Sequence, residues 1–336
     1  MPLLENMQLR DKHTFHIEAS TRFWADFESV EELCNILNDK RFIDYPKFSI
    51  GGGSNLLFTR DYPGLLIHST LHSIELTECA NGNVLVRAGS GVLWDDLVEY
   101  AVEHGLSGLE NLSGIPGEVG ASSIQNIGAY GSEAKDSIEL VEALELETLE
   151  MKSFSNVDCR FGYRDSIFKK ELKNKFIVCY VTYNLSKFFI PNLKYGDLNE
   201  RMEKAGGVSL KNVRNAILDI RNSKLPDPKH IGNAGSFFMN PEIPKIQFEK
   251  LKMKFPDMPF WPLSDDRVKV SAAWCIDKAG WKGKKLGNAA VHYKQALVLV
   301  NPGNAVAADI IILSDRIMED VKALFGIQLH PEVIFI

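Results

Sequence analysis

The segment Ser113-Gly-Ile-Pro-Gly-Glu-Val-Gly-Ala-Ser-Ser-Ile-Gln-Asn-Ile-Gly-Ala-Tyr-Gly131 consists mainly of small residues. Its apolar residues follow neither the 3.6-residue period of a helix nor the alternation of a strand. Five glycines in nineteen residues carry an entropic cost, which close approach of the backbone to a flat or anionic ligand would explain. The alternative is a surface loop, but Glu118 is the only charged residue here. The composition therefore favours a ligand-binding segment.

A second glycine-rich segment lies nearer the N-terminus. The predicted strand Phe48–Ile50 runs directly into Gly51-Gly-Gly-Ser-Asn55, which is a candidate phosphate-binding turn. This turn is not a dinucleotide fingerprint, because Leu56 stands where the third glycine is required. A Walker loop is absent as well, since Gly283-Lys284 is followed by Lys285 and not by serine or threonine. These exclusions argue against Rossmann and P-loop proteins and leave a nucleotide site open.

The composition is that of an ordinary soluble protein long enough for two domains. Of 336 residues, 45% are hydrophobic and 24% are charged, and the net charge of −6 argues against a broad nucleic-acid interface. The five cysteines are widely spaced without a Cys-x-x-Cys pair, which indicates a reducing compartment. We see no long apolar segment and no His-Glu-x-x-His motif. We therefore expect a cytoplasmic protein without a membrane span or a metal site.

The periodicity predicts mixed helices and strands without strict alternation, which favours an α+β architecture over a doubly wound sheet. Pro226 and Pro228 forbid a helix, and we place a domain boundary there. The predicted helices are a helix opened by the capping box Ser29-x-x-Glu32, Trp94–Glu103, Leu210–Asn222, Ser271–Ala279 and Ala305–Phe325. The predicted strands are Leu65–His68, Val84–Ala88, Leu140–Leu149, Lys175–Leu185, Ala296–Val300 and Leu329–Ile336. The core-facing residues predicted for the last helix are Val306, Ile310, Leu313, Ile317, Val321 and Leu324.

Three polar residues are candidates for chemistry, and each has an ordinary alternative. Ser236 lies in Gly-Ser-Phe-Phe, where its hydroxyl is either a proton donor or a turn residue. Arg164, after Gly-Tyr, is suited to a carboxylate or phosphate, or to a surface ion pair. Glu332 in the apolar terminal segment is either functional or solvent-facing. The residues alone leave these alternatives open.

Five motifs in the same order along the chain resemble the UDP-N-acetylenolpyruvoylglucosamine reductases, also called UDP-N-acetylmuramate dehydrogenases. The matching segments are Gly51–Asn55, Ser113–Gly131, Cys159-Arg-Phe-Gly-Tyr-Arg-Asp-Ser166, Gly232-Asn-Ala-Gly-Ser-Phe-Phe238 with Asn240-Pro241, and Pro331-Glu-Val333. The segment from Phe188 to Asp197, which we expect to be an exposed loop, is similar to the tyrosine-bearing loop of the longer form of the family.

The resemblance implies an FAD-binding fold of the vanillyl-alcohol-oxidase type followed by an α+β substrate-binding domain. The FAD-binding region would comprise residues 1–223, in two α+β subdomains of about 1–70 and 71–223. The C-terminal strand 327–336 would complete it, and residues 224–326 would form the substrate-binding domain. The expected FAD is non-covalent, and its expected contacts are Gly51, Gly52, Gly53, Ser54, Asn55, Ile115, Pro116, Gly120, Ser122, Ser123, Ile124 and Gly128.

The implied reaction is the NADPH-dependent reduction of UDP-N-acetylglucosamine enolpyruvate to UDP-N-acetylmuramate for peptidoglycan. Hydride would pass from NADPH to FAD and from N5 to the enolpyruvyl C3. Arg164 and Glu332 match the family residues that polarise the substrate carboxylate, and Ser236 matches the acid that protonates C2. The expected partners are these two small molecules, without nucleic acid or membrane, and we expect a monomer. The expected substrate contacts are Tyr163, Tyr195, Lys224, Asn240, Lys269 and Gln295.

Two other functions compete with this interpretation. An oxidase of small alcohols would share the flavin fold, but many such enzymes attach FAD through a His or Cys near the glycine-rich segments. Neither residue type occurs in Gly51–Asn55 or Ser113–Gly131. A nucleotide-binding regulatory protein without turnover is the other alternative, and bound flavin colour would distinguish it.

Overall fold

The computed structural model describes residues 4–336, which form two compact units. The first unit contains residues 4–7, 21–52 and 63–223, and the second contains residues 8–20, 53–62 and 224–336. The second unit therefore contains the whole chain from Lys224 onward, including the C-terminal residues 327–336. The assignment of these residues to FAD-binding and substrate-binding domains stays a prediction.

A four-stranded sheet in the first unit carries the first glycine-rich turn. Its order is β1-β2-β5-β3, and β3 runs parallel to β5 and ends immediately before Gly51. Helix α1 (Val30–Asn38) packs on this sheet, and Ser29 Oγ accepts the predicted capping hydrogen bond from the Glu32 amide at 3.1 Å. The strands are β1 (Leu4–Gln8), β2 (Ser20–Phe27), β3 (Lys47–Ile50) and β5 (Tyr62–Ser69).

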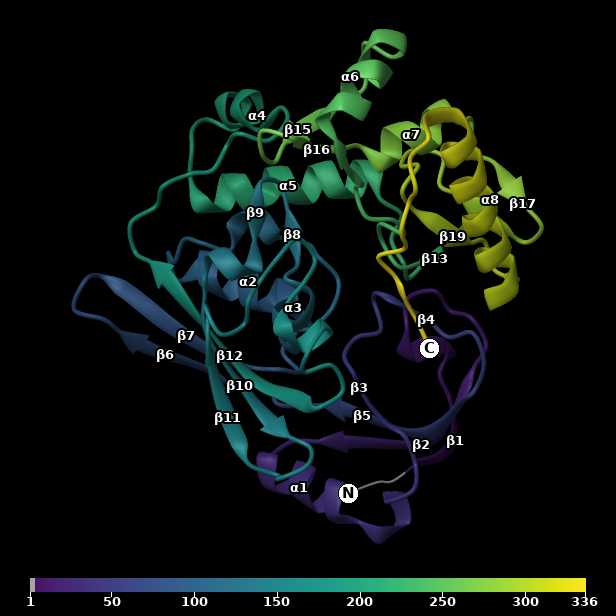
Figure 1. Cartoon of the computed structure of the whole chain (residues 1–336). Coiled ribbons are helices and arrows are strands. Elements are labelled where there is room, and N and C mark those ends of the chain that lie inside the picture. The colour runs from purple at the N-terminus through teal and green to yellow at the C-terminus, as the bar shows by residue number, and fades with distance from the viewer. Residues whose placement is uncertain (1–3) are drawn as a thin grey trace. The chain divides into compact units, whose positions relative to one another are not determined.

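A five-stranded antiparallel sheet forms the other part of the first unit, with the order β11-β10-β12-β7-β6. Val141, Val181 and Ala88 align across its three central strands and are fully buried. Helices α2 (Trp94–Glu103) and α3 (Val119–Gln125) lie against this sheet (Figure 1). The strands are β6 (Ile74–Glu78), β7 (Asn83–Gly89), β10 (Ile138–Glu145), β11 (Met151–Ser155) and β12 (Phe176–Ser186).

Helix α3 was not expected from the sequence, because it lies inside the Ser113–Gly131 segment that lacks helical periodicity. Its buried residues are small and polar as well as apolar, so a count of apolar residues does not reveal its inward face. A further unpredicted helix, α4 (Leu198–Lys204), precedes the predicted helix α5 (Leu210–Lys224). The short strands β8 (Gly128–Ala129) and β9 (Ser132–Glu133) pair at the end of the glycine-rich segment.

The second unit combines two small sheets with three helices. One sheet has the order β13-β19-β18-β17 and packs against α8, as Figure 1 shows, and the other has the order β14-β16-β15. A parallel pair, β20 with β4, brings the C-terminal residues beside residues 56–57. The strand predicted over 327–336 was too long, because only residues 334–335 form a paired strand. The helices are α6 (Lys245–Lys254), α7 (Ala272–Lys278) and α8 (Ala307–Phe325). The strands are β4 (Leu56–Leu57), β13 (Gly232–Asn233), β14 (Glu242–Pro244), β15 (Phe260–Pro262), β16 (Arg267–Val270), β17 (Lys285–Leu286), β18 (Ala289–Val291), β19 (Leu299–Asn301) and β20 (Ile334–Phe335).

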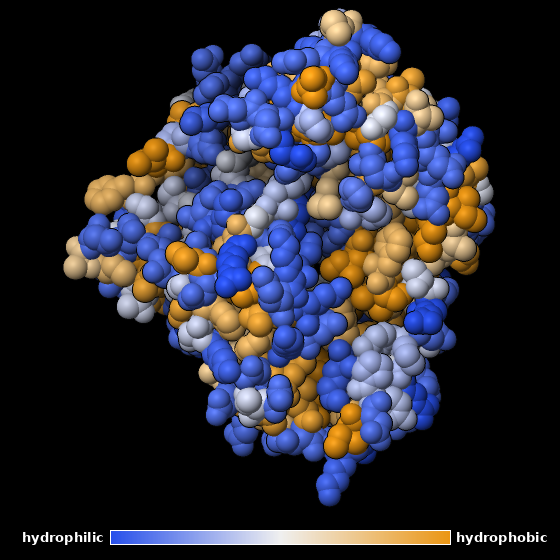
Figure 2. All heavy atoms as spheres, viewed as in Figure 1, coloured by the Kyte–Doolittle hydropathy of each residue, from blue (hydrophilic) through white to orange (hydrophobic). Residues whose placement is uncertain are grey.

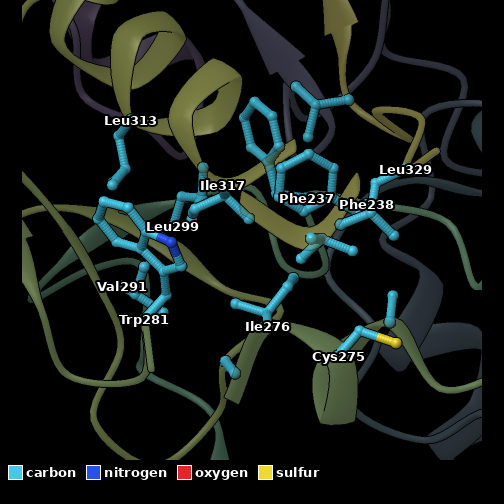
Figure 3. Close-up of a cluster of buried hydrophobic side chains, with 14 of the residues drawn as sticks. Phe237, Phe238, Cys275, Ile276, Trp281, Val291, Leu299, Leu313, Ile317 and Leu329 are labelled. Carbon is cyan, nitrogen blue, oxygen red and sulfur yellow. The ribbon is translucent and has the colours of Figure 1, made fainter. Parts of the chain in front are cut away.

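The core of the second unit gathers side chains from α7, α8, the sheet and the segment around Phe237 and Phe238 (Figure 3). On α8, the four middle positions predicted to face the core are buried. The two end positions were wrong: Val306 is the N-cap residue, and Leu324 is 48% exposed. Phe325 takes the inward place at the C-terminal end, four residues after buried Val321, as the helical period allows.

Apolar and polar side chains are interspersed over the face of the molecule that Figure 2 shows. None of the helices within residues 4–336 combines the length and the apolar character that crossing a bilayer requires.

The two leucines of α8 provide a matched pair for testing this packing. Leu313 is fully buried, so Leu313→Ala removes core contacts and leaves a cavity, and we expect a loss of about 2–5 kcal/mol in unfolding free energy. Leu324→Ala, at an exposed position of the same helix, should change stability by less than about 1 kcal/mol. Urea unfolding measures both values, and equal losses would contradict the orientation of α8.

Candidate active site

The two glycine-rich segments predicted from the sequence meet in the first unit. A Cβ atom placed on Gly51 would lie 3.1 Å from Oε2 of Glu118, and one on Gly52 would lie 3.6 Å from the Cα atom of Gly117. Gly51 therefore lies against the Glu118 side chain and Gly52 against the Gly117 backbone, at positions where neither glycine has a side chain of its own. This contact joins segments that are about sixty-six residues apart in the sequence.

Other glycines of the Ser113–Gly131 segment are required by the packing of the protein itself. A Cβ atom on Gly120 would lie 2.8 Å from Cβ of Ser90, and one on Gly128 would lie 2.8 Å from a guanidinium nitrogen of Arg164. Either substitution would force a neighbour to move. The composition that indicated a ligand thus also reflects close packing of this segment on the sheet and its loops.

The hydroxyl groups of the segment face inward. In α3, Ser122 donates to the Val119 carbonyl oxygen at 2.7 Å and contacts the buried Tyr183 hydroxyl at 2.7 Å. Ser123 donates to the Gly120 carbonyl oxygen at 3.0 Å, and both serines are fully buried. Ile115 and Ile124 pack against the same core. The predicted contacts of these four residues with the cofactor remain predictions.

A partly buried charge cluster lies beside the first glycine-rich turn, and sequence reasoning missed two of its members. His68 is 2.9 Å from Asp26 through Nδ1 and 3.0 Å from Glu118 through Nε2. Burial alone lowers the pKa of His68, but hydrogen bonds to both carboxylates and their negative charges outweigh it and raise the pKa to about 9. Glu118 was visible in the sequence as a lone charge. His68 and Asp26 had no signal, because only the sheet brings them to it.

Arg164 reaches the end of the same segment. It donates to the Gly128 carbonyl oxygen at 2.5 Å, and its backbone has a φ of +55°, which is uncommon for a residue with a side chain. Asn126 Nδ2 donates to the Gly162 carbonyl oxygen at 2.7 Å and so ties the turn that carries Arg164 to the glycine-rich segment. The Tyr163 ring lies beside the guanidinium at 5.4 Å. The first unit thus brings the predicted Arg164 and Tyr163 to the predicted flavin segment.

The segment from Phe188 to Asp197 is a loop, and Phe188, Ile190 and Tyr195 are exposed. Asn111 Nδ2 donates to the carbonyl oxygens of Tyr130 and Asn192, at 2.9 Å each. The Tyr195 ring packs edge-on against Tyr130, with centroids 5.2 Å apart. Asn111 and Asn192 thus anchor the loop to the glycine-rich segment, a role that their positions in the sequence did not indicate.

The second unit brings Ser236 and Glu332 onto neighbouring segments. The Glu332 amide donates to the Phe237 carbonyl oxygen at 2.8 Å, and the Met239 amide donates to the His330 carbonyl oxygen at 3.0 Å. Phe237 is anchored in the buried core shown in Figure 3. Ser236 itself is exposed, and its hydroxyl makes no hydrogen bond within residues 4–336. A rigid base therefore carries a serine hydroxyl that is available to a ligand.

The remaining predicted contacts are distributed over both units. Asn55, in the second unit, donates through Nδ2 to the Glu332 carbonyl oxygen at 3.1 Å. Asn240 Oδ1 accepts from the Ala272 amide at 3.0 Å at the start of α7, and Gln295 Oε1 accepts from the Leu297 amide at 3.3 Å. Lys269 lies on β16 opposite Glu242. Lys224 ends α5 and is exposed.

The described part of the chain holds no group of three or more His, Cys, Asp or Glu side chains placed to bind a metal ion. All five cysteines are free.

Comparisons with known proteins cover the whole chain. Residues 23–148 match the model of an FAD binding domain, and residues 227–336 match that of the UDP-N-acetylenolpyruvoylglucosamine reductase C-terminal domain. The chain is 49% identical over 332 residues to UDP-N-acetylenolpyruvoylglucosamine reductase of Bacteroides fragilis, with 99% of each chain covered. The chain belongs to the UDP-N-acetylenolpyruvoylglucosamine reductase family.

Further members of the family give the same result. The enzyme of that name from Flavobacterium johnsoniae is 44% identical, with 99% of each chain covered, and that from Neisseria gonorrhoeae is also 44% identical, with 98% of this chain and 96% of the relative covered. The crystal structure of the Thermus caldophilus reductase matches the fold with a TM-score of 0.69 at 24% identity, covering 99% of this chain and 98% of that chain. The expected fold and family are confirmed: an FAD-binding domain is followed by the C-terminal domain of this family, in a flavin oxidoreductase.

The family and the matched domain imply FAD as the cofactor, and residues of the first unit are suited to bind it. The turn at Gly51–Gly52 and the Ser113–Gly131 segment lie together, and the buried Oε2 of Glu118 beside them has no hydrogen-bond partner within residues 4–336. A bound nucleotide with donor groups would satisfy that oxygen.

The charge cluster predicts a pH-dependent contribution to stability. The pKa of His68 is about 9 in the folded protein, above its ordinary 6.5, so the contribution is complete below pH 6.5 and is lost as the pH rises through about 9. His68→Gln should therefore cost roughly 2–3 kcal/mol more at pH 6 than at pH 10. Urea unfolding of both proteins at the two pH values measures this, and a pH-independent difference would contradict a protonated His68.

Proposed function

We propose that this protein reduces the enolpyruvyl ether of UDP-N-acetylglucosamine to the lactyl ether of UDP-N-acetylmuramate, with NADPH as the electron donor. The proposal is supported by the relatives, which are 41–49% identical over nearly the full chain and are named for UDP-N-acetylenolpyruvoylglucosamine reduction. The observation that carries it here is the exposed Ser236 hydroxyl, without a protein partner in residues 4–336, on a segment paired with that of Glu332. The reaction would belong to peptidoglycan precursor synthesis, and its proposed site is the cytoplasm.

Bound FAD would accept hydride from NADPH and supply it from N5 to C3 of the enolpyruvyl group. Negative charge then develops at C2 and spreads into the neighbouring carboxylate. A cation placed on that carboxylate lowers the barrier, because it stabilises charge that appears only as the reaction proceeds. Arg164 would supply this charge, and the turn tied to Gly128 would hold its guanidinium in place. Glu332 would assist it in binding and polarising the carboxylate.

Protonation of C2 completes the reaction and requires an acid positioned at that carbon. Ser236 would donate its proton to C2, so that hydride and proton together saturate the double bond. A serine hydroxyl is a weak acid, so the charges around the bound substrate must assist the transfer. Arg164 lies in the first unit and Ser236 with Glu332 in the second, and their joint action on one substrate is part of this proposal.

Binding of the UDP portion would use the predicted residues of both units. Tyr163 and Tyr195 would contribute from the first unit, and Lys224 together with Asn240, Lys269 and Gln295 would contribute from the second. Tyr195 is half exposed on its anchored loop, which suits a side chain that closes over a ligand. The non-covalent FAD contacts would be those predicted from the sequence, and the active form would be a monomer.

Ser236→Ala should separate the two half-reactions. We expect flavin reduction by NADPH to stay within about twofold of wild type, since it needs no proton at C2. Reoxidation by the enolpyruvyl substrate should slow by about 10²–10⁴-fold, which is the usual contribution of a positioned acid. Anaerobic stopped-flow spectroscopy at 450 nm follows each step. Ser264→Ala, at an exposed serine of the same unit, is the control, and normal reoxidation of Ser236→Ala would remove Ser236 from the mechanism.

Arg164→Ala should slow the same oxidative step by about 10²–10³-fold, because charge stabilisation of the developing enolate is lost. Arg164 also binds the Gly128 carbonyl oxygen, so FAD content and the rate of flavin reduction must be measured alongside. Arg164→Lys keeps the positive charge without the planar fork and should fall between wild type and Arg164→Ala. Oxidative rates that do not depend on the charge at position 164 would show that Arg164 acts only in packing.

A further inference from the structure

Glu118 is a buried carboxylate with one oxygen bound and the other without a partner. The residue is 7% exposed, and Oε1 lies 3.0 Å from Nε2 of His68. Oε2 is buried and meets no hydrogen-bond donor anywhere in residues 4–336. Leaving a buried polar atom without a hydrogen bond destabilises the protein, and the effect is larger for a charged group. Buried polar atoms in proteins are nearly always hydrogen-bonded. We therefore expect a bound ligand to donate the hydrogen bond that Oε2 lacks.

The unpartnered oxygen points at the first glycine-rich turn. Oε2 lies 3.1 Å from the position that a Cβ atom on Gly51 would occupy, and Oε1 lies 3.7 Å from the corresponding position on Gly52. A side chain at residue 51 would crowd this oxygen. The turn at Gly51–Gly52 and the carboxylate of Glu118 therefore lie next to each other in the first unit.

The carboxylate is held rigidly in that direction. His68 is raised to a pKa of about 9 by its two carboxylate partners and so donates through both ring nitrogens at neutral pH. Its other nitrogen binds Asp26 at 2.9 Å, and the same Asp26 oxygen accepts from the Trp24 indole at 3.0 Å. The Trp24 ring also lies beside the His68 ring, with centroids 5.6 Å apart. His68 and Asp26 thus act as positioning residues for Glu118.

The chemistry of Oε2 selects its partner. A carboxylate oxygen accepts hydrogen bonds, and it repels a phosphate group. If the turn at Gly51–Asn55 binds the FAD diphosphate, the donors next to that diphosphate are the hydroxyl groups of the ribityl chain and of the ribose. We propose that Glu118 binds FAD directly, with Oε2 accepting a hydrogen bond from a hydroxyl group next to the diphosphate. This inference rests on FAD as the cofactor and not on the proposed substrate.

Glu118→Gln tests the proposal with nearly unchanged shape. Protonated His68 requires an acceptor, so the amide oxygen of the glutamine must face it and the amide NH₂ must face the flavin hydroxyl. The hydroxyl can then only accept from the NH₂, so the variant loses the stronger hydrogen bond to a charged carboxylate. We expect the FAD dissociation constant to rise about 10–100-fold, measured by quenching of flavin fluorescence on the apoprotein.

Glu110→Gln is the matched control, because Glu110 is equally buried in the same unit and both its oxygens are bound by the protein. Ser107 Oγ donates to Oε1 at 3.3 Å, and the Gly108 amide donates to Oε2 at 2.7 Å. This variant should lose thermal stability and keep its FAD affinity within about threefold. An unchanged FAD dissociation constant in folded Glu118→Gln, or an equal loss in Glu110→Gln, would overturn the proposal.

Fragments of the cofactor identify which hydroxyl is bound. If the partner is a ribityl hydroxyl, Glu118→Gln weakens FMN binding and leaves ADP binding unchanged, and a ribose hydroxyl gives the reverse. Either result supports the proposal, and no change for either fragment contradicts it. Turnover of the wild-type protein is measured separately, and failure to reduce the enolpyruvyl sugar would refute the proposed function. The FAD affinities of the variants would still test whether Glu118 binds FAD.

Discussion

The first unit depends on glycines whose backbone lies in close contact with side chains of other segments. Gly51 meets Glu118, Gly120 meets Ser90, and Gly128 meets Arg164, and a Cβ atom at any of these glycines would lie within about 3.1 Å of its neighbour. The contact lets the turn after β3, helix α3 and the turn that carries Arg164 gather around one segment. A protein interior packs at nearly crystalline density, so the loss of one such contact would displace the others.

This packing gives the glycine-rich segment more than one role. The same small residues that suit a flavin contact also allow α3 to lie against the sheet, with Ser122 on the buried Tyr183 hydroxyl. Tyr130 of this segment and the nearby Asn111 also anchor the loop that carries Tyr195. The predicted cofactor contacts, the core packing and part of the loop anchoring therefore involve one stretch of chain. If the segment binds FAD as predicted, a substitution in it will change FAD affinity and stability together, unless it alters a single hydrogen-bonding group as at Glu118.

The second unit holds its candidate residues in a different way. Ser236 and Glu332 lie on segments joined by backbone hydrogen bonds, and the phenylalanines after Ser236 are buried in the core of that unit. The strong apolar anchor fixes the backbone while the serine hydroxyl remains exposed. Such an arrangement suits a proton donor, which must be positioned accurately and also reach its ligand.

The local sequence pattern was enough to predict elements that depend mainly on nearby residues. The capping box at Ser29 opened α1, α2 spans the residues expected for it, and the motif order identified the flavin fold and the family. It failed where packing decides: α3 has a buried face of small residues, and the ends of α8 were assigned too many inward positions. The sequence by itself thus determined the family, the cofactor and the candidate residues Arg164, Ser236 and Glu332. Only the tertiary structure joined His68 and Asp26 to Glu118, because hydrogen bonds between segments forty to fifty residues apart leave no local periodicity to detect.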